Sequence, residues 1–165
     1  MHALRPPLLF AALISLALLL TGCSRGAKPR FAVIDAAVTQ RTDEGFVVTF
    51  LVEGDNSGDT AVPLRQVRYS LSLGGDRVFQ GVRSAEATLP RQGRQQFPLP
   101  VAVQHVDWPR ADGAPLAEAD YKLEARISYL APGALAEILF DSGFRRPKVS
   151  FSERGVLTAD AVTPE

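Results

Sequence analysis

An alternating run at residues 66–73 constrains this sequence more than any other feature. Every second residue of the run is apolar, and the residues between them are polar or charged. The apolar members are Val67, Tyr69, Leu71 and Leu73, and the polar members are Gln66, Arg68, Ser70 and Ser72. Because successive side chains of a strand point to opposite faces, this pattern predicts a strand with one face on a core. Gly74 and Gly75 follow at once and predict a tight hairpin, with the return strand starting at Arg77.

Further alternating runs extend this prediction to most of the chain. They occupy residues 31–39, 46–53, 84–89, 97–103 and 121–129, and turn residues separate them. Another returning strand is expected at residues 136–140 and 143–151. We find no convincing amphipathic helix. About seven short strands of this kind predict an all-β fold, an antiparallel β-sandwich.

Two of the predicted strands carry information about their place in a sheet. Residues 46–53 are partly apolar on both faces, which favours a central strand. Pro98 and Pro100 lie on the same in-plane side of the strand at residues 97–103, so both missing N–H groups face the same neighbour position. A strand that can pair on one side only belongs at a sheet edge.

A series of short motifs resembles the water stress and hypersensitive response (WHy) domain of the group 2 late embryogenesis abundant (LEA) proteins. That family has an Asn turn, a Pro-Leu strand entry, a Tyr-containing strand, a glycine hairpin, a further Gly, a Leu-Pro pair and an apolar strand with Pro. The matching residues are Asn56, Pro63, Leu64, Tyr69, Gly74, Gly75, Gly81, Leu89, Pro90 and residues 99–103. One departure is that residues 57–62 separate Asn56 from Pro63, which are adjacent in the family.

The resemblance covers residues 31–151, so these residues are expected to form the folded domain. It implies a fibronectin-type-III-like or immunoglobulin-like sandwich. It also implies an association with desiccation or stress tolerance, through protection of proteins or membranes. Residues 152–165 lack periodicity, and we expect them to be a flexible tail.

The first residues have the pattern of a bacterial lipoprotein signal peptide, residues 1–22. Arg5 precedes an apolar run at residues 8–20, which is shorter than the about 20 residues of a membrane-spanning helix. The run ends in a lipobox of Leu20, Thr21, Gly22 and Cys23. Because Cys23 is the only cysteine of the chain, we expect it to be lipidated and followed by a tether, residues 23–30. The alternative is a secretory or membrane helix that happens to precede a cysteine.

Localisation and composition narrow the expected partners. Ser24 after the cysteine favours export to the outer membrane, facing the periplasm, where the lipid anchor makes the membrane a partner. An apolar fraction of 46% is ordinary for a folded domain and too high for a fully disordered protectant. The 18 basic and 18 acidic residues leave no strong basic field that would attract nucleic acid.

The chain lacks the patterns that predict catalysis, a cofactor or a metal site. His105 is the single histidine after the signal peptide, and no nucleophile elbow accompanies it. Asp55 and Asp59 invite a calcium interpretation, but their spacing departs from an EF-hand and favours an Asx-rich turn. Glu118 and Asp120 are interpreted as solvated turn residues. The basic run at residues 145–148 is either a solvated strand end or a contact for phosphate or lipid headgroups.

Two functions remain in competition. The first is a non-catalytic, lipid-anchored envelope protein that protects through weak, reversible contacts with partly unfolded client proteins. The second is a periplasmic binding or adaptor module that docks a specific envelope partner through an open sheet edge. A specific partner would co-purify in fixed stoichiometry, whereas a general protectant would act on unrelated clients.

Overall fold

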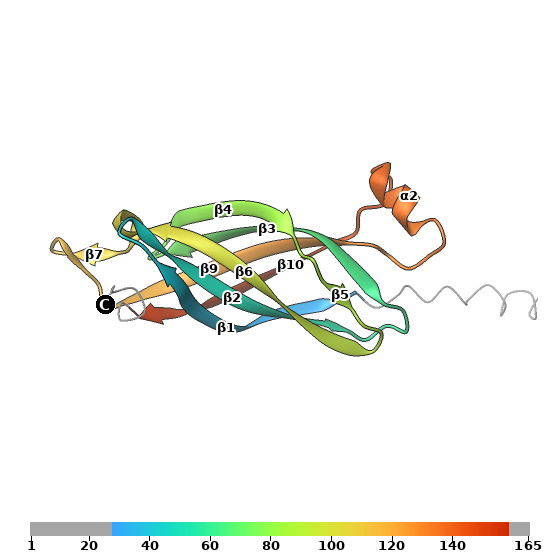
Figure 1. Cartoon of the computed structure of the whole chain (residues 1–165), viewed down its shortest axis with the longest axis horizontal. Helices are drawn as coiled ribbons and strands as arrows, with labels where there is room; N and C mark the ends of the chain where they lie inside the picture. Colours follow the sequence, from blue (N-terminus) through green and yellow to red (C-terminus); the bar gives the residue numbers. More distant parts are fainter. Residues whose placement is uncertain (1–27, 159–165) are drawn as a thin grey trace, which may run out of the picture.

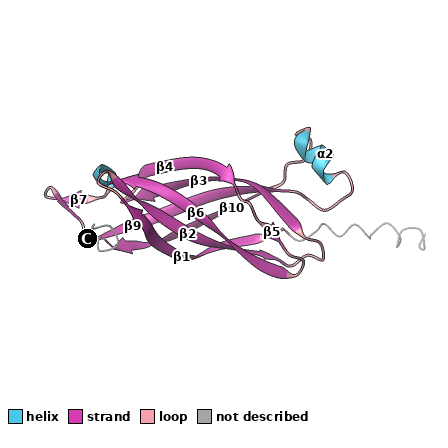
Figure 2. Cartoon of the chain, in the orientation of Figure 1, coloured by secondary structure: helices cyan, strands magenta, loops and turns pink. Residues whose placement is uncertain are grey.

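The computed structural model describes residues 28–158, in which seven long strands dominate (Figures 1 and 2). These strands are β1 (Arg30–Arg41), β2 (Gly45–Asn56), β3 (Val62–Leu73), β4 (Asp76–Ser84), β6 (Gly93–Gln104), β9 (Glu118–Tyr129) and β10 (Lys148–Thr158). The two-residue strands are β5 (Thr88–Leu89), β7 (Arg110–Ala111) and β8 (Ala114–Pro115). The helical segments are the 3₁₀ turn η2 (His105–Asp107) and α2 (Ala136–Asp141). Cys23 and the expected signal peptide lie outside the described residues.

The long strands form two antiparallel sheets. The smaller sheet has the order β1-β2-β6, and the larger has the order β10-β9-β3-β4, with β5 paired to β3. The sheets lie face to face, and β7 and β8 form a separate hairpin at one end (Figure 1). The predicted all-β, antiparallel sandwich is therefore confirmed.

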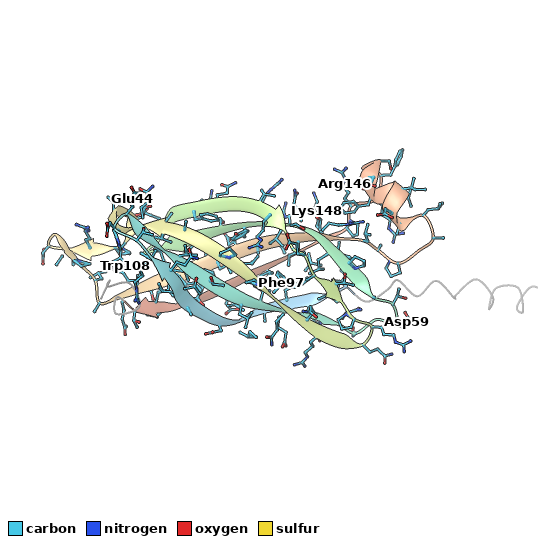
Figure 3. All side chains as sticks on the ribbon, viewed as in Figure 1. Glu44, Asp59, Phe97, Trp108, Arg146 and Lys148 are labelled. Atoms are coloured by element: carbon cyan, nitrogen blue, oxygen red, sulfur yellow. The ribbon has the colours of Figure 1, made fainter. Side chains whose placement is uncertain are left out.

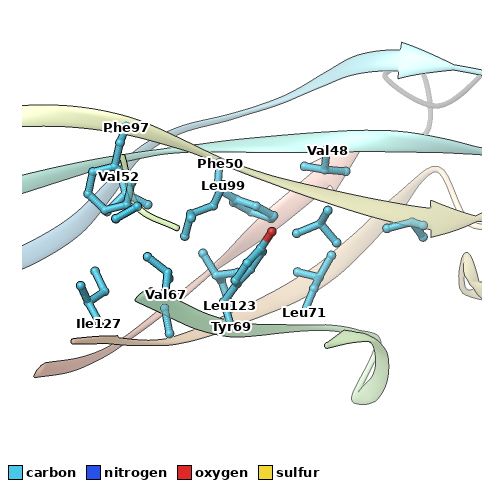
Figure 4. Packing of buried hydrophobic residues seen from close by; sticks show 14 of the residues in the cluster. Val48, Phe50, Val52, Val67, Tyr69, Leu71, Phe97, Leu99, Leu123 and Ile127 are labelled. Atoms are coloured by element: carbon cyan, nitrogen blue, oxygen red, sulfur yellow. The ribbon is translucent and has the colours of Figure 1, made fainter. Parts of the chain in front are cut away.

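The core lies between the two sheets and consists of the apolar members of the alternating runs (Figure 4). The small sheet contributes Val48, Phe50, Val52, Phe97 and Leu99, and the large sheet contributes Val67, Tyr69, Leu71, Leu123 and Ile127. Tyr69 is 5% exposed and Phe97 3%, and the other eight are fully buried. The faces that the period of two predicts are the faces that the sandwich buries.

The predictions for β2 and β6 are both confirmed. Strand β2 pairs with β1 on one side and with β6 on the other, so it is central. Strand β6 has no second partner strand in its sheet within the described residues. Pro98 and Pro100 stand opposite Leu51 and Thr49 of β2, two positions apart on this edge strand. Edge placement explains how β6 tolerates two residues that lack an N–H group.

The return strand expected at residues 136–140 is wrong, because this segment is the helix α2 (Ala136–Asp141). Alanine, glutamate and leucine in this segment are good helix formers. Two glycines with positive φ, Gly133 at 141° and Gly143 at 83°, lie on either side of the helix. A short apolar run does not distinguish a strand from a helix by periodicity, and here local propensity decided.

The predicted domain end at Phe151 and the loose tail after it are also wrong, because β10 continues to Thr158. Its ladder with β9 runs on to the pairs Leu157–Ala119 and Thr158–Glu118. A Cβ at Gly155 would lie 2.6 Å from the ring of Tyr121, so the ring fills the space beside that glycine. The apolar alternation of β10 is therefore interrupted at Glu153 and Gly155, and Leu157 beyond them is buried again. Residues 159–165 lie outside the described part.

The strand expected at residues 84–89 is divided: Ser84 is the last residue of β4, and after a break only Thr88 and Leu89 pair with β3 again, as β5. Glu86 has a φ of 49°, which interrupts an extended backbone. Leu89 is nevertheless fully buried, because it closes one end of the core.

The two ends of the sandwich carry different loops. One end, which we call the Asn56 end, holds the start of β1, the β2–β3 turn and the connection between β9 and β10, residues 130–147 (Figure 1). The opposite end, the Trp108 end, holds the β1–β2 and β3–β4 hairpins, η2 and the β7–β8 hairpin. Within residues 28–158 no helix is both long and apolar enough to cross a bilayer.

Candidate functional site

Asn56 is a buried polar residue that organises its end of the sandwich. It is 1% exposed, and its Nδ2 donates to the carbonyl oxygens of Thr60 and Pro90, each at 2.9 Å. Its Oδ1 accepts a hydrogen bond from the N–H of Gly58 at 3.0 Å. Pro63 lies at the start of β3, where it pairs with β5. Asn56 thus joins the β2–β3 turn to the β5–β6 turn through three satisfied hydrogen bonds.

Tyr69 links the two sheets. Its hydroxyl donates a hydrogen bond to the carbonyl oxygen of Pro100 on the edge strand β6, at 2.6 Å. Burial raises the pKa of Tyr69 above its usual value of 10.0, while the nearby Arg83 guanidinium opposes the rise. The fold therefore favours the protonated phenol, which is the form that donates.

The glycines of the family motif meet two different requirements. Gly74 and Gly75 have φ angles of 57° and 102°, which the β3–β4 hairpin needs and other residues rarely adopt. Gly81 stands opposite Tyr69, and a Cβ there would lie 2.7 Å from the ring of Phe79. The Phe79 and Tyr69 ring centroids are 5.4 Å apart, so Gly81 leaves room for the Phe79 ring beside Tyr69.

The acidic segment after β2 folds as a turn. Its Asx turn is the hydrogen bond from the Gly58 N–H to Asn56, and the Asp59 carboxylate accepts from the Thr60 hydroxyl at 3.3 Å. Across residues 28–158, no three His, Cys, Asp or Glu side chains lie close enough together to hold a metal ion. Glu118 and Asp120, expected in a turn, are exposed residues of strand β9.

His105 and Trp108 connect the segment that follows β6 to neighbouring loops and to the core. His105 Nε2 lies 3.0 Å from the carbonyl oxygen of Thr42 in the β1–β2 hairpin. Trp108 is 3% exposed, and its Nε1 donates to the carbonyl oxygen of Leu116 at 2.9 Å. The Trp108 ring packs against Phe46 with the centroids 5.8 Å apart, at the end opposite Asp59 (Figure 3). These contacts hold loops on the core.

The outer face of the three-stranded sheet has few charged side chains in its half toward the Trp108 end, and we call this half the uncharged face; toward the Asn56 end the same side carries the ion pair of Glu53 and Arg94. Two rows of residues cross the uncharged face from β1 over β2 to β6. They are Ala37, Thr49 and Pro100 in the first row, and Gln40, Val47 and Ala102 in the second. The next row contains Leu51 and Pro98, with Asp35 at its β1 end. Ala37, Pro98 and Ala102 are exposed, and Val47 and Leu51 are half-buried. A partly apolar face of this kind is typical of surfaces that contact other molecules.

The outer face of the large sheet is polar and cationic instead. Arg68 of β3 stands opposite Arg126 of β9, and Arg126 Nε donates to the Ser150 hydroxyl at 3.2 Å. Lys122 and Glu124 form an ion pair at 2.8 Å, and the hydrogen bond and positive charge of Lys122 lower the pKa of Glu124. A hollow of about 500 Å³ lies over this face. The sandwich therefore presents two chemically different sides.

Strand β4 (Asp76–Ser84) is an open edge of the large sheet. Within the described residues it pairs only with β3, and it contains no proline. A groove of about 570 Å³ lies beside it, lined by Val78 and Phe79 of β4, by Ala102 and Val103 of β6 and by the β1–β2 hairpin. Because its backbone is accessible on one side, β4 is the edge to which another strand can add.

Sequence reasoning missed the partners of the buried polar groups. The motif match identified Asn56 without predicting its burial or its bond to Pro90, which is distant in sequence. The position of Tyr69 on the apolar side of its strand was a usable signal, since a buried hydroxyl needs an acceptor. Nothing in the sequence pointed to Pro100 as that acceptor.

Solved structures confirm the fold. A solution structure of AT1g01470 from Arabidopsis thaliana has a TM-score of 0.57 at 14% sequence identity, with 81% of this chain and 83% of that chain covered. A solution structure of the late embryogenesis abundant (LEA) protein At2g46140.1 has a TM-score of 0.60 at 17% identity, with 90% of this chain and 84% of that chain covered. At these identities the likeness concerns the fold alone.

The family is shown by the sequence itself. No curated protein matches the chain. The profile of the family LEA_2, described as "Late embryogenesis abundant protein", matches residues 51–155, which extend from β2 into β10 and include Asn56, Tyr69 and Gly81. Because this match covers more than half of the chain, the protein belongs to the late embryogenesis abundant family LEA_2.

Proposed function

We propose that this protein is a non-catalytic, lipid-anchored protein of the bacterial cell envelope that limits damage to proteins or membranes during desiccation or related stress. Family membership supports the link to stress. The lipobox ending in Cys23 supports the anchor, and Ser24 supports an outer-membrane location facing the periplasm. The fold itself does not identify a function, because sandwiches of this kind serve many roles.

The observation that carries the proposal is the uncharged face of the three-stranded sheet. Its rows expose Ala37 and Ala102 beside the half-buried Val47, with no charged residue in either row. Partly unfolded clients expose apolar side chains, which such a face can cover without a specific pocket. Contacts of this kind are weak and non-directional, so they suit unrelated clients.

The test is protection of an unrelated enzyme from aggregation during drying or freeze–thaw. The chain from Ser24 onwards, without lipid, should protect better than an inert protein at equal mass, because crowding alone stabilises a compact state by only about 0.2–1 kcal/mol. His105→Ala, Asp55→Ala and Asp59→Ala should protect like the wild type. Leu71→Asp should abolish protection, because it places a charge in the core.

Two matched double variants locate the contact surface. Ala37→Lys with Ala102→Lys places two charges on the uncharged face, and we expect protection to fall. Gln80→Lys with Val82→Lys adds the same charge to the exposed outer side of β4 and should leave protection intact. Equal protection by both double variants contradicts a role for the uncharged face. Protection no better than the inert protein contradicts the general-protectant function.

A second candidate function, a binding module for a specific envelope partner, is favoured by strand β4. This nine-residue edge has no proline, in contrast to the edge strand β6 with Pro98 and Pro100. Strand addition at β4 would supply backbone hydrogen bonds to an extended segment of the partner. The expected observation is one envelope protein that co-purifies with the chain in fixed stoichiometry.

A further inference from the structure

The β9–β10 connection, residues 130–147, exposes a cluster of apolar side chains that packing does not explain. No residue of α2 is buried. Leu135 is 61% exposed, Ile138 66% and Phe144 88%. Eight large apolar side chains are exposed in residues 28–158, and these three lie together in one short segment. The connection therefore presents apolar surface outward instead of adding to the core.

Basic side chains follow the apolar cluster. Arg145, Arg146 and Lys148 are all exposed, and Figure 3 shows Arg146 and Lys148 beside α2. The Arg146 guanidinium donates to the carbonyl oxygens of Phe140 at 2.7 Å and of Asp141 at 3.1 Å. Arg146 thus satisfies carbonyl groups at the end of α2 and keeps its positive charge there.

The carboxylates of the segment leave this positive charge in excess. Glu137 is engaged by Arg65 of β3 at 2.8 Å, an ion pair that ties α2 to the large sheet. Asp141 is the other carboxylate between residues 130 and 148. With Arg65, four cations stand against two carboxylates in this cluster.

The expected anchor enters at the same end of the molecule. Arg30, at the start of β1, stands opposite Asp55, and Leu64 opposite Tyr129 brings the β9–β10 connection to this Asn56 end (Figure 1). Cys23 precedes Lys28, the first described residue, by five positions, which span at most about 18 Å when extended. A lipid on Cys23 would therefore hold the Asn56 end, and not the Trp108 end, close to the bilayer.

We propose that the β9–β10 connection docks on the bilayer that holds the lipid anchor. Leu135, Ile138 and Phe144 enter the boundary between headgroups and acyl chains, while Arg145 and Lys148 contact anionic phospholipid headgroups. This inference rests on the proposed lipidation of Cys23. The contact gives the domain a fixed orientation, in which the Trp108 end points away from the membrane.

The test measures quenching of indole fluorescence by brominated lipids. The mature lipoprotein is reconstituted in phosphatidylethanolamine–phosphatidylglycerol vesicles that contain brominated acyl chains, after mass spectrometry has established its acyl groups. In the wild type the indole emission comes from Trp108, the only tryptophan, and this emission should not be quenched. In Phe144→Trp, brominated lipids should quench the emission of the new indole at position 144. In vesicles without bromine, the emission of that indole should shift to shorter wavelength, because it lies in an apolar environment. Val106→Trp, at the Trp108 end and 71% exposed in the wild type, is the matched control and should stay unquenched.

A charge variant separates the electrostatic part of the contact from the insertion of apolar side chains. In the Phe144→Trp background, Arg145→Glu with Lys148→Glu should reduce the quenching, because anionic headgroups then repel the connection. Arg110→Glu, on β7 at the opposite end, should leave the quenching unchanged. Zwitterionic phosphatidylcholine vesicles and high salt should weaken quenching in the same way as the charge variant.

Each other outcome overturns a definite part of the proposal. An indole at position 144 that stays unquenched in the acylated protein refutes the membrane contact, whatever the protection assay shows. Equal quenching at positions 144 and 106 refutes the fixed orientation. An unacylated chain that is quenched at position 144 on anionic vesicles to the same extent refutes the dependence of the contact on the anchor and keeps the contact. A last outcome combines two variants. If Ile138→Ser with Phe144→Ser abolishes client protection, and Phe144→Trp shows no quenching by lipid, the connection binds clients instead of lipid.

Discussion

At the scale of single residues, the two faces of β3 behave as different environments. Leu71 is fully buried in the core, whereas its neighbour Ser70 points to the outer face, opposite Gln80 and Glu124. Tyr69 is buried like Leu71 but uses its hydroxyl to bond Pro100 on the other sheet. One strand therefore combines a packing function with a polar link between the sheets.

Leu71→Ala should lower the free energy of unfolding by about 2–5 kcal/mol, because it leaves a cavity between the sheets. Ser70→Ala should change it by no more than about 0.5 kcal/mol, since that side chain lies on the outer face. Urea denaturation of both variants measures the difference. Similar losses at the two positions would show that the two faces of β3 are wrongly assigned.

Tyr69→Phe tests the raised pKa of the buried phenol. Because the pKa of Tyr69 is raised in the fold, its stabilising contribution is complete below its usual value of about 10 and is lost as the pH rises through the folded-state value. The wild type should exceed Tyr69→Phe in urea midpoint at neutral pH, and this advantage should shrink above about pH 10. Tyr121 and Tyr129 also have pKa values raised by burial, and their contribution cancels in the comparison. A difference that is constant with pH would contradict the burial of the hydroxyl.

At the scale of elements, the two sheet edges beside the groove are protected differently. Strand β6 carries Pro98 and Pro100, which remove N–H groups from a backbone that would otherwise template another strand. Strand β4 has no such residue and remains open. The molecule thus blocks one long edge with proline and leaves the other available for pairing.

Replacing both prolines, Pro98→Thr with Pro100→Thr, should restore N–H groups to the β6 edge and promote self-association. The Tyr69 hydrogen bond should persist, because its acceptor is the backbone carbonyl of residue 100. Static light scattering across a concentration series measures the change. Pro132→Thr, in the exposed β9–β10 connection, is the control, and its light scattering should equal that of the wild type. Identical scattering from all three proteins would mean that the prolines do not guard this edge.

At the scale of the whole molecule, stability comes from a core that closes without covalent links. The only cysteine is Cys23, so the described domain contains no disulfide. The buried cluster between the two sheets is formed by side chains from Phe46 to Leu157, and partly buried residues of β1 such as Phe31 pack against it. The domain should therefore fold independently of its proposed attachment to the membrane.

Cys23→Ala should abolish membrane attachment and leave the unfolding midpoint in urea unchanged, because the buried core cluster begins only at Phe46. Mass spectrometry of the wild-type protein, extracted from membranes, should find acyl chains on Cys23. A soluble, unmodified wild-type protein that begins at another residue would contradict the lipoprotein assignment. A lowered midpoint in Cys23→Ala would mean that the amino-terminal segment contributes to the fold.

The sequence by itself determined the strands and their faces, because an alternation such as Val67, Tyr69 and Leu71 is a local property of a half-buried strand. It also determined the place of β6 through its prolines and the hairpin at Gly74. It failed at Ala136–Asp141, where a short apolar run fits either a helix or a strand. It failed again beyond Phe151, where the apolar group that fills the space at Gly155 belongs to Tyr121 of another strand.

Only the tertiary structure decided which strands pair and which distant groups meet. The pairing of β9 with β3, the bond from Asn56 to Pro90 and the bond from Tyr69 to Pro100 all join residues far apart in sequence. The same is true of the position of α2 at the end where β1 begins. Local patterns contain no information on contacts between distant residues, because the partner of each strand is decided only when the whole core packs together.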